Sequence, residues 1–360
     1  MANTLTDLIP DAYAALDVVS RELVGAIPGV QRNASADRLA SNQTLVSHVA
    51  PANTTASFTP SMAVPSAINQ TIGHKTLTLS KNKYAGFSWT GEESNSMDQG
   101  PGFLSIQQDQ IAQALRVLTN EMEADLCGAL IQSSRAYGTA GTTPFASTLA
   151  DSAQVRKILD DNGAPPSSRS LVIDTAAGAN LRTLGQLTKA NEAGGSMTLR
   201  DGELLNMHGF SIRESAQISN QVAGAMADAL FSSAGAVGDT TIAFDTGTVN
   251  TTGIVAGDVI TVSNHKYVVA TGSTSTSGNI VIEEPGLREI VADTTAITVN
   301  ATSARNVAFS SDAITLATRL PVFGNDLARD SAVITDPRTG ISFEIREYPG
   351  DGMVLYRVHA

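Results

Sequence analysis

The longest regular pattern in the sequence lies between Ser105 and Ser134. Its apolar residues recur at steps of three and four, the spacing that lines one face of an α-helix. Ser105 and Gln108 have the spacing of a capping box, and Gly100-Pro101-Gly102 just upstream prevents an earlier start. We therefore expect one straight helix of about 45 Å. The apolar residues of this stripe are Ile111, Leu115, Leu118, Met122, Leu126 and Leu130.

Polar side chains occupy the other faces of this expected helix. Glu121, Glu123 and Asp125 lie near its middle and exclude a membrane span. The apolar seam does not continue as heptads beyond the segment, so a coiled coil is disfavoured. We interpret the helix as a strut that lies on the surface of other elements.

Composition narrows the classes of protein that this chain can belong to. A length of 360 residues predicts two or three domains. The formal charge of −12 argues against a nucleic-acid-binding surface, which needs clustered Lys and Arg. Cys127 is the only cysteine, so no disulfide can form within one chain, and we expect a buried, inert thiol. With no signal peptide and no apolar run of membrane-spanning length, folding in a reducing cytoplasm is expected.

The N-terminal quarter of the chain favours extended structure after a first helix. The pattern from Leu5 to Val30 predicts a short amphipathic helix. An uncharged stretch from Asn42 to His74 follows, interrupted by three prolines, and indicates an extended arm. Thr76–Leu79 and Phe87–Trp89 alternate as a pair of strands. A long hairpin over residues 42–92 is therefore expected, and because a lone hairpin is marginal in water, another chain should stabilise it.

The remainder of the chain changes character twice. Residues 150–234 alternate helix and strand in an α/β manner, with a buried strand at 170–174. Residues 235–304 carry short strands between turn residues, which is typical of a small antiparallel barrel inserted between the α/β segments. Past the barrel, Asp312–Leu320 is predicted as a helix, and two strands end the chain. The predicted class is α+β with an inserted barrel.

The sequence contains no constellation that a reaction or a cofactor requires. No phosphate-binding loop, nucleophile elbow, zinc motif or dinucleotide fingerprint is present. No two of the histidines stand at ligand spacing in the sequence, so we predict neither a metal site nor a cofactor and expect no enzymatic activity. The histidines are His48, His74, His208, His265 and His359.

Several segments besides the long helix carry a resemblance to a known family. They are Leu5–Pro10 with Ala15-Leu16-Asp17, Asp201-Gly202 through Gly209-Phe210, Asn306–Phe309 with Asp312–Ile314, and Asp336–Gly340. With the order of the elements, these segments resemble the major capsid proteins of tailed bacteriophages, the Hong Kong 97-like fold. Within that family the chain is most similar to podovirus-type coat proteins that carry an inserted β-barrel. No single motif is diagnostic, and the likeness extends in order over nearly the whole chain.

The resemblance implies a subunit that assembles into an icosahedral shell. Residues 1–41 would be the N-terminal arm, 42–92 the extended E-loop and 93–149 the peripheral domain with the spine helix at 105–134. Residues 150–234 would form the axial domain, 235–304 the insertion domain, and 305–360 would return to the axial and peripheral domains. Hexamers and pentamers would enclose packaged double-stranded DNA in a virion capsid assembled in the cytoplasm of a bacterial host.

The resemblance also implies partners and contact residues. Because the expected arm helix begins almost at Met1, we expect a separate scaffolding protein rather than a cleaved segment. A portal protein, and in some relatives a decoration protein, would join the shell. The acidic residues Asp7, Asp11 and Asp17 are candidates for the scaffolding contact. Candidates for contacts between subunits are Phe58, Met62, Ile68, Leu77, Leu79 and Trp89.

Three other functions stay open from the sequence. An encapsulin-like compartment shares the fold, and the inserted barrel and podovirus-like arm argue against it. A β-rich adhesin or binding module would suit the Thr and Asn content, but the absent signal peptide and the long helix disfavour it. An unrecognised hydrolase would need a constellation of residues that the sequence does not show.

Overall fold

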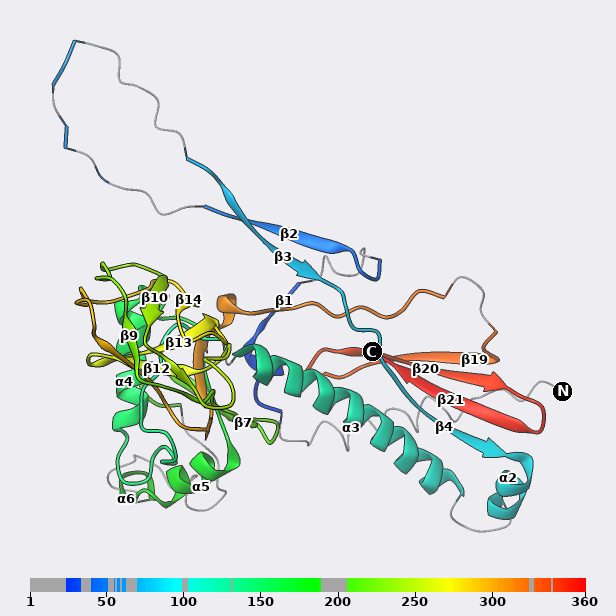
Figure 1. Cartoon of the computed structure of the whole chain (residues 1–360). Coiled ribbons are helices and arrows are strands. Elements are labelled where there is room, and N and C mark those ends of the chain that lie inside the picture. The colour runs from blue at the N-terminus through cyan, green and yellow to red at the C-terminus, as the bar shows by residue number, and fades with distance from the viewer. Residues whose placement is uncertain are drawn as a thin grey trace.

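A computed structural model of the chain describes residues 24–33, 40–50, 55, 57–58, 60–62, 70–98, 103–130, 132–188, 206–323, 327–337 and 339–360. The described part is elongated (Figure 1). A long helix joins a sheet at one end of the molecule to an α/β lobe and a barrel at the other, and a hairpin projects from between them. No helix among the described residues is long and apolar enough to cross a membrane.

The long helix, α3, spans Phe103–Leu130. The expected apolar stripe is confirmed, because Ile111, Leu115, Leu118 and Leu126 are buried and Met122 is partly buried. Two details of the prediction are wrong. Ser105 lies inside the helix rather than at its cap, and the helix ends before Ser134 because the backbone leaves the α conformation at 132–134.

A four-stranded antiparallel sheet lies along α3. Its order is β19 (Asp330–Thr335), β20 (Ser342–Pro349), β21 (Met353–His359) and β4 (Tyr84–Thr90). The short helix α2 (Gly91–Asp98) follows β4. The predicted pairing of Phe87–Trp89 with Thr76–Leu79 is wrong, because β4 pairs with β21 along its whole length. Phe87 stacks on Tyr356 across that pair, with ring centroids 5.1 Å apart, and this packing draws β4 into the sheet.

The hairpin consists of β2 (Thr44–Val49) and β3 (Gly73–Thr78), which pair in register over six residues. It leaves the body of the molecule as a two-stranded ribbon (Figure 1). The strand β4 does not belong to it, so the hairpin ends before Tyr84 rather than at residue 92.

The first described segment, residues 24–33, packs against the long helix. Residues 24–30 contain the 3-10 turn η1 (Ile27–Gly29) and no α-helix, while the rest of the helix expected from Leu5 lies outside the described residues. The strand β1 (Gln31–Arg32) pairs in parallel with β18 (Thr315–Leu316). The helix predicted over Asp312–Leu320 is therefore wrong: only the 3-10 turn η3 (Ser311–Ala313) forms, and pairing with β1 keeps the next residues extended.

The α/β lobe is built around β5 (Arg169–Ile173), all of whose residues are buried. This strand pairs in parallel with β6 (Phe210–Glu214) and antiparallel with β17 (Val307–Ser310). The helices α4 (Ala150–Asp161), α5 (Thr175–Thr183) and α6 (Gly185–Thr188) belong to the same lobe. The strand expected at 170–174 and the helix after it are confirmed.

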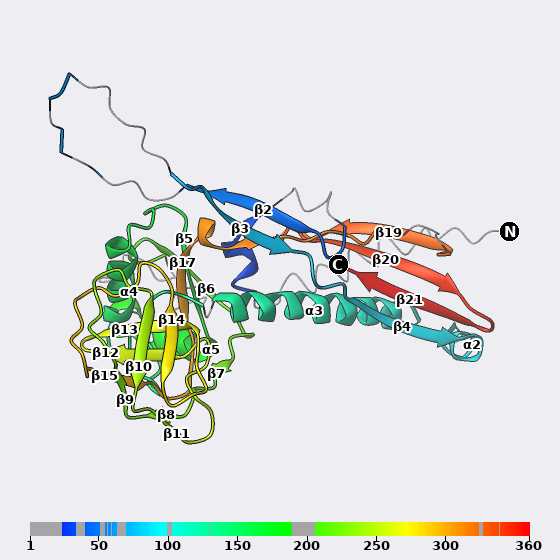
Figure 2. The same cartoon turned by 45° about the horizontal axis from the view of Figure 1, so that its top comes forward.

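A closed barrel interrupts the lobe (Figure 2). The chain leaves the lobe after β6 and returns at β17, and the two linking strands, β7 (Asn220–Gln221) and β16 (Ser303–Ala304), pair with each other. The insertion thus begins near residue 220, earlier than the expected 235. The strand pair β8 (Met226–Ala227) and β11 (Thr248–Val249) flanks the barrel. The barrel order is β10 (Thr241–Asp245), β14 (Gly278–Ile282), β13 (His265–Thr271), β12 (Val259–Val262), β15 (Ala296–Val299) and β9 (Ala229–Phe231).

We expect residues 220–304 to fold as an isolated fragment. The barrel has its own buried cluster, which includes Phe231, Ile260 and Tyr267, and its two linkers already meet as a pair. The fragment should give dispersed amide resonances and a cooperative thermal transition. Ile260→Asp, which buries an unpaired charge, is the matched control and should abolish that transition. A wild-type fragment that melts without cooperativity would contradict the expectation.

Candidate functional site

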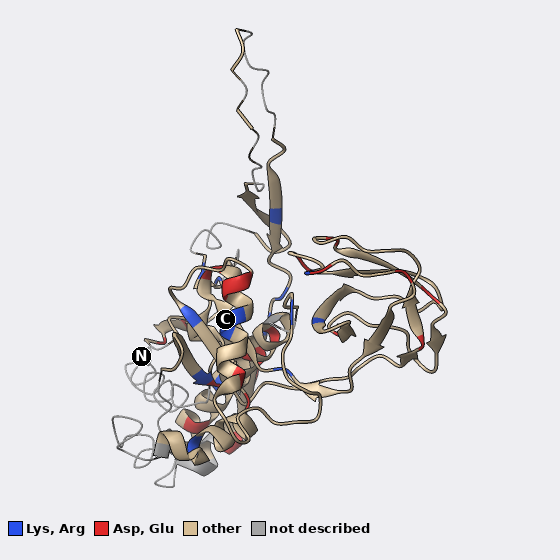
Figure 3. Cartoon of the chain, turned by 90° about the vertical axis from the view of Figure 1, so that its left-hand side faces the viewer, with Lys and Arg blue, Asp and Glu red and all other residues tan. Residues whose placement is uncertain are grey.

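The hairpin is the most distinctive surface of the chain, because several of its described apolar side chains are exposed. Residues 39–74 contain no Asp, Glu, Lys or Arg, and Figure 3 shows the projecting ribbon almost free of charge. Phe58 and Met62, in the outer loop, are 90% and 106% exposed. Val46, Val49 and Ile72 are also exposed. Such a concentration of exposed apolar groups on a monomer is typical of a surface that another protein covers.

The six residues predicted to contact other subunits differ in their exposure to solvent. Phe58 and Met62 are fully exposed, and Leu77 and Leu79 are partly buried at the base of the hairpin. Ile68 lies outside the described residues, as do the scaffolding candidates Asp7, Asp11 and Asp17.

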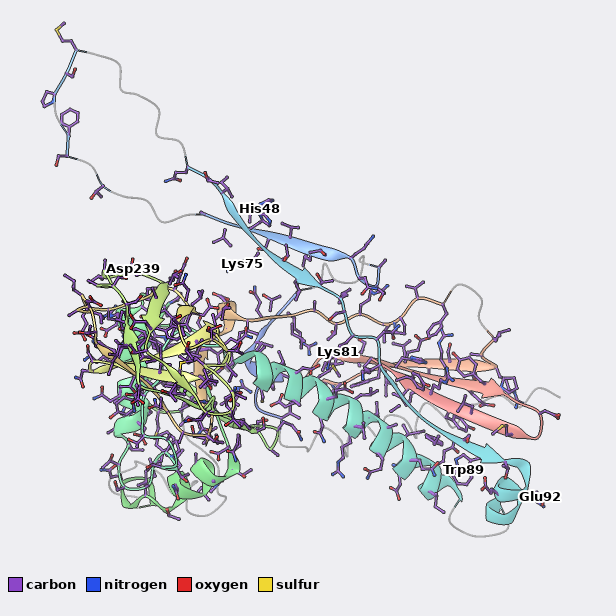
Figure 4. All side chains as sticks on the ribbon, in the orientation of Figure 1. His48, Lys75, Lys81, Trp89, Glu92 and Asp239 are labelled. Carbon is purple, nitrogen blue, oxygen red and sulfur yellow. The ribbon has the colours of Figure 1, made fainter. Side chains whose placement is uncertain are left out.

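Trp89, the sixth predicted contact residue, is buried within its own subunit. Its side chain is only 8% exposed, at the junction of β4 and α3 (Figure 4). The indole N–H donates a hydrogen bond to Gln110 Oε1 at 2.7 Å. A buried indole with a satisfied N–H stabilises the fold of its own subunit, and the contact of Trp89 with another subunit stays a prediction.

The base of the hairpin is tied to the long helix by ion pairs. Lys81 Nζ lies 2.6 Å from Asp125 Oδ2 and 3.4 Å from Glu121 Oε1, and Lys83 Nζ lies 3.4 Å from the same Glu121 oxygen. The hydrogen bond to Asp125 raises the pKa of Lys81. These groups are exposed, so the ion pairs orient the linker between β3 and β4 more than they stabilise the fold.

An apolar groove runs along the edge between β4 and α3. It has a volume of about 380 Å³ and is lined mainly by apolar side chains and by the aliphatic parts of polar ones. Ile106 and Val117 are exposed on its rim. The groove is thus a second surface that a neighbouring chain can cover.

A buried carboxylate on the long helix holds the N-terminal segment. Glu123 is fully buried, whereas the sequence placed it among the polar residues of the helix. Its Oε1 accepts the backbone N–H groups of Gly25 at 2.8 Å and Ala26 at 2.7 Å, and its Oε2 accepts that of Ile27 at 3.0 Å. A signal was available in the sequence, because position 123 lies eight residues after Leu115 and so falls on the buried stripe.

A larger cavity of about 1110 Å³ lies between the barrel and the α/β lobe. Some of its polar groups make structural contacts: Asp151 Oδ2 accepts the Phe145 N–H at 2.8 Å, and Arg135 lies 3.0 Å from His265 Nδ1. Among the described residues no group of three or more His, Cys, Asp and Glu side chains could hold a metal ion.

Cys127 is buried on the long helix, as the sequence predicted. Burial raises the pKa of its thiol to about 11, and its Sγ lies 3.7 Å from Ser215 Oγ. The neutral thiol at physiological pH packs as a small apolar side chain.

The histidines fall into two groups that the sequence did not distinguish. His208 bonds to Ser152 Oγ at 2.8 Å, His265 contacts Arg135, and His359 is buried. His48 and His74, in contrast, are exposed and stand directly opposite each other in the hairpin. Sequence reasoning missed this pair because its members are 26 positions apart and only the strand register brings them together.

We expect the stability of the sheet to fall as the pH drops below about 6.5, the ordinary pKa of histidine. Burial lowers the pKa of His359, and Arg346 and Arg357 lower it further against the opposing effect of Glu344. Because the folded state favours the neutral ring, the unfolded state takes up the proton first, and stability present above that pH is lost on acidification. The loss can reach about 1.4 kcal/mol per pH unit.

The check on His359 is a comparison of thermal unfolding at pH 7.5 and pH 5.0. His359→Phe keeps the ring contacts with Tyr84 and Phe323 and should show a smaller pH-dependent decrease in melting temperature than the wild type. Equal pH dependence in the variant and the wild type would contradict the assignment.

Comparison with known proteins gives matches among solved structures alone. No protein-family model and no curated protein matches the sequence. A structure from Mycobacterium phage Che8 is 14% identical, with a TM-score of 0.42, covering 73% of this chain and 89% of its own. The mature capsid of bacteriophage PhiM1 is 12% identical, with a TM-score of 0.35 and coverage of 78% and 83%. The capsid of cyanophage P-SCSP1u is 11% identical, with a TM-score of 0.38 and coverage of 83% and 87%.

These similar structures all come from phages. Two of them are capsids. Because the TM-scores lie below 0.5, the function proposed below is argued from the residues and surfaces of this chain.

Proposed function

We propose that this chain is the major capsid protein of a tailed bacteriophage, with a Hong Kong 97-like fold and an inserted barrel. The main support for the proposal is the exposed and uncharged surface of the hairpin. The hairpin is uncharged over residues 39–74, exposes Phe58 and Met62 almost completely, and its two strands form a separate two-stranded sheet. A two-stranded ribbon of this kind gains its burial from a neighbouring subunit.

The elements of the chain correspond to the parts of such a subunit. The hairpin is the E-loop, and α3 with the four-stranded sheet is the peripheral domain. The lobe around β5 is the axial domain, and the barrel is the insertion domain. Residues 1–41 are the N-terminal arm, of which 24–33 pack on α3 and β18.

Contacts between subunits would place one copy's hairpin on another copy. The apolar groove between β4 and α3 offers a surface of matching chemistry to Phe58 and Met62, since each would otherwise remain in water. Hexamers and pentamers built in this way would close into an icosahedral shell. Leu77 and Leu79 at the hairpin base, and Ile68, remain proposed contributors.

The charge of the chain suits a wall around packaged DNA. A net charge of −12 prevents tight adhesion to the phosphate backbone. The DNA would therefore be enclosed without specific binding, and the role is structural rather than catalytic. A separate scaffolding protein, a portal protein and a decoration protein are proposed partners, with Asp7, Asp11 and Asp17 as the proposed scaffolding contact. Assembly would take place in the cytoplasm of the bacterial host.

Electron microscopy of the purified chain tests the proposal. The chain should be expressed alone and together with the proteins encoded beside its gene. Closed shells, spirals or misclosed particles are the expected result, and their contents would distinguish a DNA-filled phage shell from a compartment that stores enzymes. A compact monomer that persists at high concentration in every mixture would refute the proposal and favour a β-rich binding module.

A further inference from the structure

One face of the hairpin carries a ladder of paired side chains. Residues that alternate along a strand share a face, and residues directly opposite each other in an antiparallel pair are neighbours. The register of β2 and β3 therefore places three pairs on this face: Thr44 with Thr78, Val46 with Thr76, and His48 with His74. The histidine pair is the outermost of the three.

The pair nearest the hairpin base, Thr44 and Thr78, shows how close opposed side chains on this face come. Thr44 Oγ1 and Thr78 Oγ1 lie 3.1 Å apart, so directly opposed side chains touch across the ribbon. Because His48 and His74 stand in the same relation two pairs further along, their Cβ atoms are expected to lie about 5 Å apart. Two imidazoles at that spacing can turn one ring nitrogen each toward a common point.

Both rings are available to a ligand. His48 and His74 are exposed, and among the described residues neither has a hydrogen bond, ion pair or ring contact. Figure 4 shows His48 on the ribbon well away from the body of the molecule. Lys75 is the charged residue nearest to this pair in the sequence. It directly follows His74 and pairs with Ser47, so its side chain lies on the opposite face of the hairpin.

We propose that His48 and His74 together chelate a divalent transition-metal ion of the kind that imidazole prefers, Zn²⁺ or Cu²⁺. Imidazole nitrogens bind Zn²⁺ at about 2.0–2.1 Å, a length that two opposed rings can reach. No third protein ligand is present among the described residues, so water completes the coordination. The site is separate from the proposed shell function and does not depend on it.

The bound ion would act as a staple near the outer end of the ribbon. Only one pair, Val49 with Gly73, lies beyond the histidines before the regular ladder ends. A link between the two strands at this point would oppose fraying of the ladder and fix its register. Strand amides of 44–49 and 73–78 should therefore exchange more slowly with the ion bound.

Calorimetric titration of ZnCl₂ into the untagged full-length chain, with hydrogen exchange measured in parallel, tests the proposal. We expect one ion per hairpin and slower exchange in both strands. His48→Ala and His74→Ala should each weaken binding at least about tenfold and remove the protection, since even loss of a supporting group costs that much at metal sites. Ser47→Ala and Lys75→Ala, which alter the opposed pair on the other face, should bind as the wild type. Wild-type affinity in both histidine variants, or no binding and no protection in the wild type, would overturn the proposal.

Discussion

Glu123→Ala should lower the free energy of unfolding by about 3 to 5 kcal/mol, because it removes the acceptor of three buried backbone N–H groups at once. The donors belong to Gly25, Ala26 and Ile27, all of them buried against α3. A buried N–H without an acceptor loses the hydrogen bond that water supplies in the unfolded chain. The N-terminal segment should therefore detach from the helix before the rest of the molecule unfolds.

Two variants separate this role from a general effect of removing charge from the helix. Glu121→Ala, two residues earlier, removes an exposed partner of Lys81 and Lys83 and should cost less than about 1 kcal/mol. Glu123→Gln keeps the shape but replaces one acceptor oxygen with a donor that faces backbone N–H groups, so it should be closer to the Ala variant than to the wild type. Calorimetry with hydrogen exchange at residues 25–27 is the measurement. Equal melting temperatures for Glu121→Ala and Glu123→Ala would contradict the prediction.

Removal of the outer loop of the hairpin should abolish closed shells while leaving the subunit folded. The deletion covers Asn53–Ser66, closed by a short Gly-Ser linker, and includes the exposed Phe58 and Met62. The described residues of this loop contribute nothing to the three buried clusters of the subunit, so the melting temperature should stay within a few degrees of the wild type. The loss of assembly should be complete, because each missing contact recurs at every subunit of a symmetric shell.

Electron microscopy of the deletion variant beside the wild type provides the measurement. A matched variant, Phe58→Ser with Met62→Ser, keeps the length of the loop and removes its apolar side chains. It should yield fewer closed particles than the wild type if apolar burial is the basis of the contact. Normal shells from the deletion variant would refute the assignment of the hairpin as an assembly element, whereas an unfolded deletion variant would show that the loop supports the subunit itself.

The periodic parts of the structure could be predicted from the sequence. The stripe of α3 has buried residues at helical spacing, and the barrel strand β10 alternates between buried and less buried residues. The strand at 169–173 is instead a continuous buried run bounded by turn residues. Periodicity reports which side of an element is apolar, and that information is local. Exposure of the hairpin was also predictable, because a long uncharged stretch broken by prolines cannot build a core of its own.

The sequence by itself determined the faces of the elements, and the tertiary structure decided their partners. The alternating pattern within Tyr84–Thr90 predicts a strand. Only the tertiary structure shows that this strand pairs with Met353–His359 rather than with the hairpin. The three N–H groups held by Glu123 and the opposition of His48 to His74 depend in the same way on residues that are distant in sequence. The physical reason is that the free energy of a long-range contact includes burial and chain closure over the whole molecule, and neither quantity is encoded in the spacing of nearby residues.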